Sequence, residues 1–140
     1  MVDPGRMLLL VAILIVAVVG VVYLAFATKR RPILDQSKYQ AHWLEIEHSV
    51  AKDNPASWQL AIMNADKLLD QALRERRFNG KTMGERMKSA QSTWSNANHV
   101  WSAHKIRNQL AHETSAHVTY DITLRALSAY KHGLKDVGAI

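Results

Sequence analysis

Residues 7–27 form an apolar run that contains no charged side chain and consists mainly of Leu, Val, Ile and Ala. A helix of this length, with a rise of about 1.5 Å per residue, is about 31 Å long, which matches the roughly 30 Å hydrocarbon layer of a bilayer. The run therefore predicts an N-terminal transmembrane anchor over residues 1–28. We expect it to contact the lipid bilayer through residues 7–27 and to contribute nothing to a soluble core.

A cleaved signal peptide is the main alternative, because Arg6 precedes the run and Ala25-Phe26-Ala27 has the small-x-small form of a cleavage site. The apolar part of a signal peptide is usually about 7 to 15 residues long, and Lys29-Arg30-Arg31 resembles a stop-transfer flank. We therefore expect an uncleaved, single-pass anchor. Because the cations follow the helix, the positive-inside rule predicts an outside N-terminus and a cytoplasmic C-terminal domain.

The rest of the chain, about 110 residues, is enough for one small domain but not for two. The formal net charge of +6 lies wholly on this part, because Asp3 and Arg6 offset each other in the anchor. A basic excess favours polyanions, which include RNA, DNA and an anionic membrane surface. The absence of cysteine excludes disulfides, thiolate chemistry and Cys-ligated zinc.

The hydrophobic pattern after the anchor is helical, and no strand-like alternation persists in residues 37–137. Residues 29–36 form a tether in which Pro32 ends the membrane helix. The pattern predicts an all-α domain over residues 37–140, an antiparallel up-and-down helical bundle. The expected helices cover residues 37–52, 55–76, 82–90, 97–112 and 119–137, with Asn54 as an N-cap, a capping box at Thr82–Glu85 and Gly138 as a stop.

The expected core is built around one apolar stripe on the second of these helices. Its members recur at spacings of four and three: Trp58, Ile62, Ala65, Leu69 and Ala72. We expect this stripe to be buried against Ile106, Leu110, Ile122 and Leu134, and Asp66, Lys67 and Asp70 to occupy the wetter faces of the same helix. The four tryptophans are expected core anchors; Trp94 has base stacking as an alternative, because it lies in a polar break.

A cluster of chemistry-bearing residues lies on the helix predicted at 97–112. Arg107-Asn108 is followed by His112, so a permanent cation, an amide and a titratable imidazole lie within six residues. His104, Asn108 and His112 share one stripe, whereas Arg107 and His112 diverge by about 140° around an ideal helix. An architectural role is the alternative: Asn108 could bond a neighbouring helix, His112 could cap its own helix, and Arg107 could pair with Glu113 or Asp121.

The stretch from Ala103 to Glu113, AHKIRNQLAHE, resembles the signature of the HEPN superfamily, in which an Arg, often followed by Asn, precedes a His by four to six residues. The resemblance implies a small all-α bundle and a metal-independent endoribonuclease or RNA-binding module. It also implies a homodimer, because in that family two protomers bring their Arg and His residues into a shared cleft. Such a dimer would answer the divergence of Arg107 and His112, for which a distorted end of the helix is the alternative.

Carried over residue by residue, the resemblance implies three catalytic residues. Arg107 would stabilise the charge of the scissile phosphate, His112 would act as general acid or base, and Asn108 would orient one of them. His104 and Glu113 are secondary candidates. RNA-binding candidates are the neighbouring Lys105 and a cation-rich segment that could instead be a lipid-facing patch or a solvated helix end: Arg74, Arg76, Arg77, Lys81, Arg86 and Lys88.

No spacing typical of a metal site, a phosphate-binding glycine loop or a nucleophile elbow occurs, so the sequence predicts no metal and no cofactor. The alternative to an RNA-directed function is a non-catalytic, membrane-tethered helical scaffold or protein-interaction module with the same fold. The sequence identifies no particular protein partner for such a scaffold.

Overall fold

The computed structural model describes residues 3–27 and 31–140, and every element in these ranges is helical. Lys29 and Arg30 of the predicted stop-transfer flank lie outside the described residues. The chain divides after Arg31 into two units, Met1–Arg31 and Pro32–Ile140.

The first unit contains one helix, α1 (Pro4–Ala27). Its stretch Pro4–Phe26 is long and apolar enough to cross a membrane, judged by length and composition. Its Leu, Val and Ile side chains are exposed, which in water would be unfavourable and in hydrocarbon costs nothing. The helix begins before the uncharged run because the Asp3 side chain caps it by accepting a hydrogen bond from the Gly5 amide at 3.2 Å.

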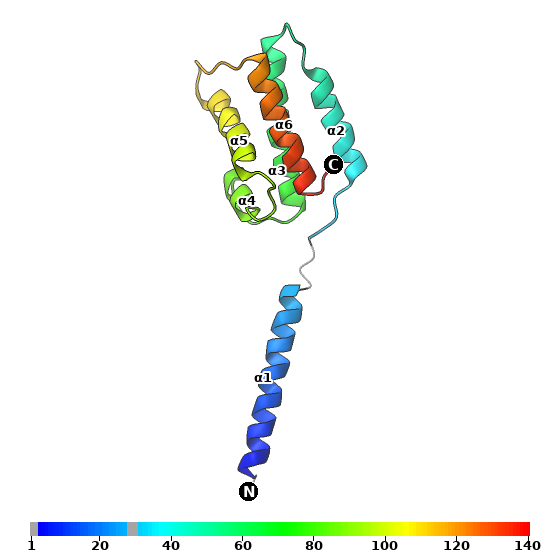
Figure 1. Ribbon diagram of the computed structural model, residues 1–140, viewed down its shortest axis with the longest axis vertical. Helices are drawn as coiled ribbons and strands as arrows, with labels where there is room; N and C mark the ends of the chain where they lie inside the picture. The colour runs from blue at the N-terminus through cyan, green and yellow to red at the C-terminus, as the bar shows by residue number, and fades with distance from the viewer. Residues whose placement is uncertain (1–2, 28–30) are drawn as a thin grey trace. The chain divides into compact units, whose positions relative to one another are not determined.

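The second unit is a bundle of α2 (Gln36–Ser49), α3 (Pro55–Glu75), the short α4 (Met83–Ser89), α5 (Ala97–His112) and α6 (Tyr120–Asp136). The long helices α2, α3, α5 and α6 alternate in direction along the chain (Figure 1). The prediction of an apolar N-terminal helix followed by an all-α bundle is therefore confirmed.

Side-chain caps fix where these helices begin. The Asn54 side chain accepts from the Ala56 amide ahead of α3, and Thr82 and Glu85 form the predicted capping box of α4. The α6 helix begins one residue later than expected, because Thr119 is its N-cap. Gly138 has φ 75° and follows the C-cap of α6, so the helix ends there as the sequence predicted.

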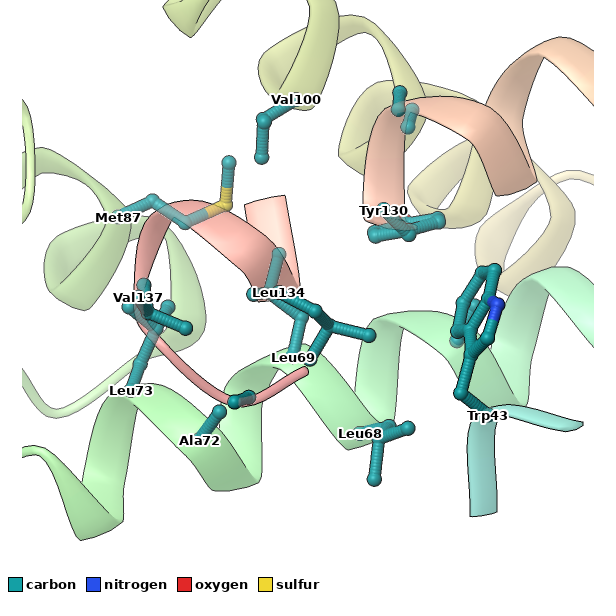
Figure 2. Close-up of a cluster of buried hydrophobic side chains, with 14 of the residues drawn as sticks. Trp43, Leu68, Leu69, Ala72, Leu73, Met87, Val100, Tyr130, Leu134 and Val137 are labelled. Atoms are coloured by element: carbon teal, nitrogen blue, oxygen red, sulfur yellow. The ribbon is translucent and has the colours of Figure 1, made fainter. Parts of the chain in front are cut away.

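The core lies where α3 contacts α2, α4, α5 and α6 (Figure 2). Ile62, Ala65, Leu69 and Leu134 are fully buried, as expected. Burial of Trp58 was predicted wrongly: it lies in the first turn of α3, where its ring packs on Tyr120 at a centroid distance of 5.9 Å and stays half exposed.

Three of the four predicted partners on α5 and α6, Ile106, Leu110 and Ile122, are less buried than expected. Ile106 and Leu110 only flank the core, and Ile106 and Ile122 line an open groove between the two helices. Trp94 is buried, and its Nε1 donates to the Met87 carbonyl at 3.0 Å. Trp94 is thus a core residue, and a base cannot stack on it.

Candidate active site

Asp66 is the buried acid around which the candidate site is built. The expectation that it occupies a wet face of α3 is wrong: the residue is only 4% exposed. It lies four residues after Ile62 and three before Leu69, so the same stripe that makes α3 amphipathic carries a carboxylate into the core. A buried carboxylate is costly unless its oxygens receive hydrogen bonds.

Three side chains from two other helices surround that carboxylate. On α5, His104 Nδ1 lies 2.7 Å from Asp66 Oδ1, and on α6 the Tyr130 hydroxyl donates to the same oxygen at 2.9 Å. Arg107 Nε lies 3.2 Å from Oδ2, an ion pair without good hydrogen-bond alignment. We call Asp66, His104, Arg107 and Tyr130 the Asp66 cluster.

The protonation states within the Asp66 cluster follow from its geometry. Burial, together with the negative charge of Asp66, raises the pKa of Tyr130 far above its usual range, so the phenol is a permanent donor. A carboxylate only accepts hydrogen bonds, so we assign a proton to His104 Nδ1. In the neutral ring, Nε2 then carries a lone pair.

His104 and Arg107 reach a cleft of about 780 Å³ between α3, α5 and the start of α4. Its lining residues are Met63, Asn64, Asp66, Lys67, Asp70, Thr82, Met83, Gly84, Trp101, His104, Arg107 and Asn108. The Trp101 ring is half exposed and meets the His104 ring edge-on at 6.2 Å. Among the residues that the structure describes, Asp66 is the one that forms a side-chain hydrogen bond with His104, through Nδ1.

The structure separates the predicted motif into two parts. Arg107 and Asn108 both line the cleft, and Arg107 Nη1 donates to the Asn108 side-chain oxygen at 3.0 Å. His112 is exposed, is the last residue of α5 and does not line the cleft. Arg107 pairs with Asp66, not with Glu113 or Asp121 as the architectural alternative supposed.

The predicted RNA-binding cations differ in how available they are. Lys105, Arg77, Lys81 and Lys88 are exposed. Arg74 is exposed but pairs with Asp70 at 3.0 Å, and Arg76 donates to the Pro32 carbonyl at 2.8 Å. Arg86 is buried; it pairs with Asp70 at 2.7 Å and donates to the Gly80 carbonyl. Its guanidinium therefore interacts within the bundle and is not presented to a ligand.

Sequence reasoning missed four residues of this site: Asp66, Lys67, Trp101 and Tyr130. The available signal was Asp66 itself, since an acidic residue in register with Ile62 and Leu69 must find donors on neighbouring helices. Which donors it finds depends on the packing of α5 and α6, which no local pattern encodes.

Among residues 3–27 and 31–140, no group of three His, Asp or Glu side chains is arranged to hold a metal ion. Comparisons with protein-family models, with curated proteins and with solved structures each found no match.

Proposed function

We propose that the protein is a membrane-anchored, HEPN-like protein whose bundle binds RNA and cleaves it without a metal. The observation that carries the proposal is that a cation, an amide and an imidazole converge on one cleft: Arg107, Asn108 and His104. Arginine binds phosphate oxygens in a fixed fork, and histidine exchanges protons near neutral pH. Together they suit phosphodiester chemistry.

The rest of the cleft supports a nucleotide ligand. Lys67 adds a second cation, and its side chain is exposed. Trp101 offers a half-exposed indole on which a base could stack, in a way that tolerates any base sequence. An unstacked base needs a single strand, so we expect single-stranded RNA to be preferred over duplex.

The position of His112 supports a homodimer. It lies five residues, or about 1.4 turns, beyond Arg107 and outside the cleft of its own subunit, so the proposal has a second copy bring it there. The proposal therefore places α5 of one subunit against the cleft of another, around a twofold axis.

The proposed orientation has the bundle in the cytoplasm, where RNA is present. It rests on the positive flank after the apolar run. A cytoplasm-only reporter fused after Ile140 is expected to be active, and protease added to intact cells should leave the bundle uncut. Cleavage of the bundle from outside would contradict both the orientation and the RNA-directed function.

The nuclease activity can be tested with the full chain in detergent micelles, incubated with mixed RNA in EDTA. We expect cleavage that is lost in Arg107→Ala and in His112→Ala but kept in Arg125→Ala, which removes an exposed cation on α6. Mixing Arg107→Ala with His112→Ala chains should restore part of the activity, because one of the two composite sites in each mixed dimer then contains both side chains. Cleavage that requires a divalent metal would contradict the proposal.

A non-catalytic scaffold is the second candidate, and one observation favours it. The contact of Arg107 with Asp66 is internal to one subunit and joins α5 to α3, which is what a structural cross-link does. A scaffold predicts that Arg107→Ala destabilises the bundle while the wild-type chain leaves RNA intact. The same preparations, followed by urea unfolding, separate the two functions.

A further inference from the structure

We infer that His104, oriented by Asp66, is the general base of the cleft and activates the 2′-hydroxyl of an RNA strand. The inference rests on the proposed function and names a residue outside the Arg-Asn-x-x-x-His motif. It also restricts the substrate class to RNA, because DNA has no 2′-hydroxyl to activate.

The first step of the argument is the orientation of the ring. His104 Nδ1 is held 2.7 Å from a carboxylate oxygen that is itself fixed by the Tyr130 hydroxyl at 2.9 Å. The ring therefore cannot present Nδ1 to a ligand. Its opposite nitrogen, Nε2, carries the lone pair, and the residue lines the cleft.

The second step is the position of the phosphate-binding cation. Arg107 lies one turn after His104 on α5, and the two side chains approach the two oxygens of the same Asp66 carboxylate, at 3.2 Å and 2.7 Å. Both residues line the cleft, so a phosphate bound there by the Arg107 guanidinium would lie in the same cleft as the His104 ring. Lys67 lines the same cleft and can neutralise a second phosphate oxygen.

The chemical step then balances as follows. Nε2 of His104 accepts the proton of the 2′-hydroxyl, the 2′-oxygen forms a bond to phosphorus, and the bond from phosphorus to the 5′-oxygen breaks. The products are a 2′,3′-cyclic phosphate and a 5′-hydroxyl. The leaving 5′-oxygen takes its proton from the His112 imidazolium of a second copy, and the two rings return to their starting states by exchange with water.

This division of roles explains why the two histidines lie so differently. A base and an acid must act on opposite sides of the phosphorus in an in-line displacement, so they cannot occupy one position. His104 is buried, oriented and inside the cleft, whereas His112 is exposed at the end of α5. The buried ring suits the fixed base, and the exposed ring suits an acid delivered by a second subunit.

The test uses two substrates with the full chain in detergent micelles: RNA with an ordinary linkage, and RNA with sulfur in place of the bridging 5′-oxygen. A 5′-thiolate leaves without protonation, so it bypasses a missing acid but not a missing base. The variant is His104→Asn, whose amide can still donate to Asp66 from about the place of Nδ1 but has nothing at Nε2. His112→Gln is the comparison, and His48→Gln, an exposed residue on α2, is the control.

We expect His104→Asn to lower kcat/KM about 10²- to 10⁴-fold on both substrates, the range typical of a lost general base. His112→Gln should lose as much on the ordinary linkage and recover on the sulfur substrate, and His48→Gln should behave as wild type. Equal activity of His104→Asn and wild type would overturn the inference and leave the proposed function standing. Failure of the wild type to cleave either substrate would overturn both.

A second measurement does not depend on activity. Long-range ¹H–¹⁵N spectra of the histidine rings report which nitrogen carries the proton in the neutral form. For His104 we expect Nδ1, and a proton on Nε2 would overturn the inference. Urea unfolding of His104→Asn within about 1 kcal/mol of wild type would exclude a folding defect as the cause of its lost activity.

Discussion

At the scale of single residues, burial of the Asp66 carboxylate is unfavourable, and the polar side chains around it offset that cost. Removing a carboxylate from water costs several kcal/mol, and the attraction of its partners offsets this only when its oxygens are well satisfied. Here Oδ1 receives His104 and Tyr130, while Oδ2 faces Arg107. The Asp66 cluster therefore joins α3, α5 and α6 through polar contacts at the place where the cleft begins.

Replacing Asp66 by Ala should destabilise the bundle by about 3–5 kcal/mol, because three polar side chains lose their shared partner. Tyr130→Phe should cost less, about 1–3 kcal/mol, since it removes a single hydrogen bond to a charged acceptor. The free energy of unfolding in urea measures both. Equal losses at the two positions would mean that Asp66 is not the shared centre.

The sequence predicted part of this site. Arg107 and Asn108 were predicted from their motif, and both reach the cleft. Asp66 was misplaced because charged residues on an amphipathic helix are usually solvated, and nothing local marks the exception. Tyr130 and Trp101 were missed because their roles arise from packing between helices distant in the sequence.

At the scale of helices, α2 and α6 are joined at the surface by an ion pair. Lys131 Nζ lies 2.7 Å from Glu47 Oε1, and both side chains are about one-third exposed. Burial raises the pKa of Glu47, but the hydrogen bond from Lys131, the Trp43 indole and the nearby positive charges together outweigh it and hold the pKa below the ordinary 4.5. A carboxylate whose pKa is lower in the folded than in the unfolded state stabilises the fold at pH values above its unfolded-state pKa. This stabilisation is lost as the pH falls through its folded-state pKa.

Glu47→Gln should therefore cost about 0.5 kcal/mol at pH 7, the usual size for a solvated pair, and nothing once the pH is below the folded-state pKa. Urea unfolding at a series of pH values from 7 downwards measures the difference. Glu45→Gln, an exposed change on the same helix, is the control and should show no such window. A cost for Glu47→Gln that grew on acidification would contradict the sign of the shift.

Close contact between helices also depends on one glycine. A Cβ at Gly133 of α6 would lie 3.3 Å from Leu69 on α3 and 3.4 Å from Val100 on α5. Gly133→Leu should cost about 1–3 kcal/mol by overpacking. Gly84→Leu is the matched control, because a Cβ at Gly84 would meet Trp101 at an ordinary 3.9 Å. Similar unfolding midpoints for the two variants would show that the helices can separate at Gly133 without loss.

Helix positions were easier to predict than side-chain burial. The caps at Asn54, Thr82 and Thr119 act within one turn, so the sequence around each is enough to define a helix start. Burial of Trp58 and Leu110 depends instead on how far each helix end projects past its neighbours. That distance is a property of the assembled bundle.

At the scale of the whole molecule, the apolar α1 should determine where the protein is found. Wild type should remain with membranes in alkaline carbonate and be released by detergent. Changing Leu14 and Val18 together to Arg should abolish retention, because each cation at the centre of a span costs about 2.5–3.5 kcal/mol. The same positions changed to Ile should have no effect. A wild-type protein whose mature N-terminus follows Ala27 would instead establish a cleaved signal peptide.

The Asp66 cluster also constrains how this protein can evolve. Loss of the Asp66 carboxylate alone would leave the buried Tyr130 hydroxyl and His104 Nδ1 without their shared acceptor, so an apolar substitution there should be selected against even if the cleft had no function. The four residues can be lost without this penalty only if apolar residues replace them together. A protein changed in that way would keep the bundle but lose the His104 imidazole and the Arg107 guanidinium. In related chains we therefore expect these four positions to covary as a block, with Tyr130 becoming Phe wherever Asp66 becomes apolar.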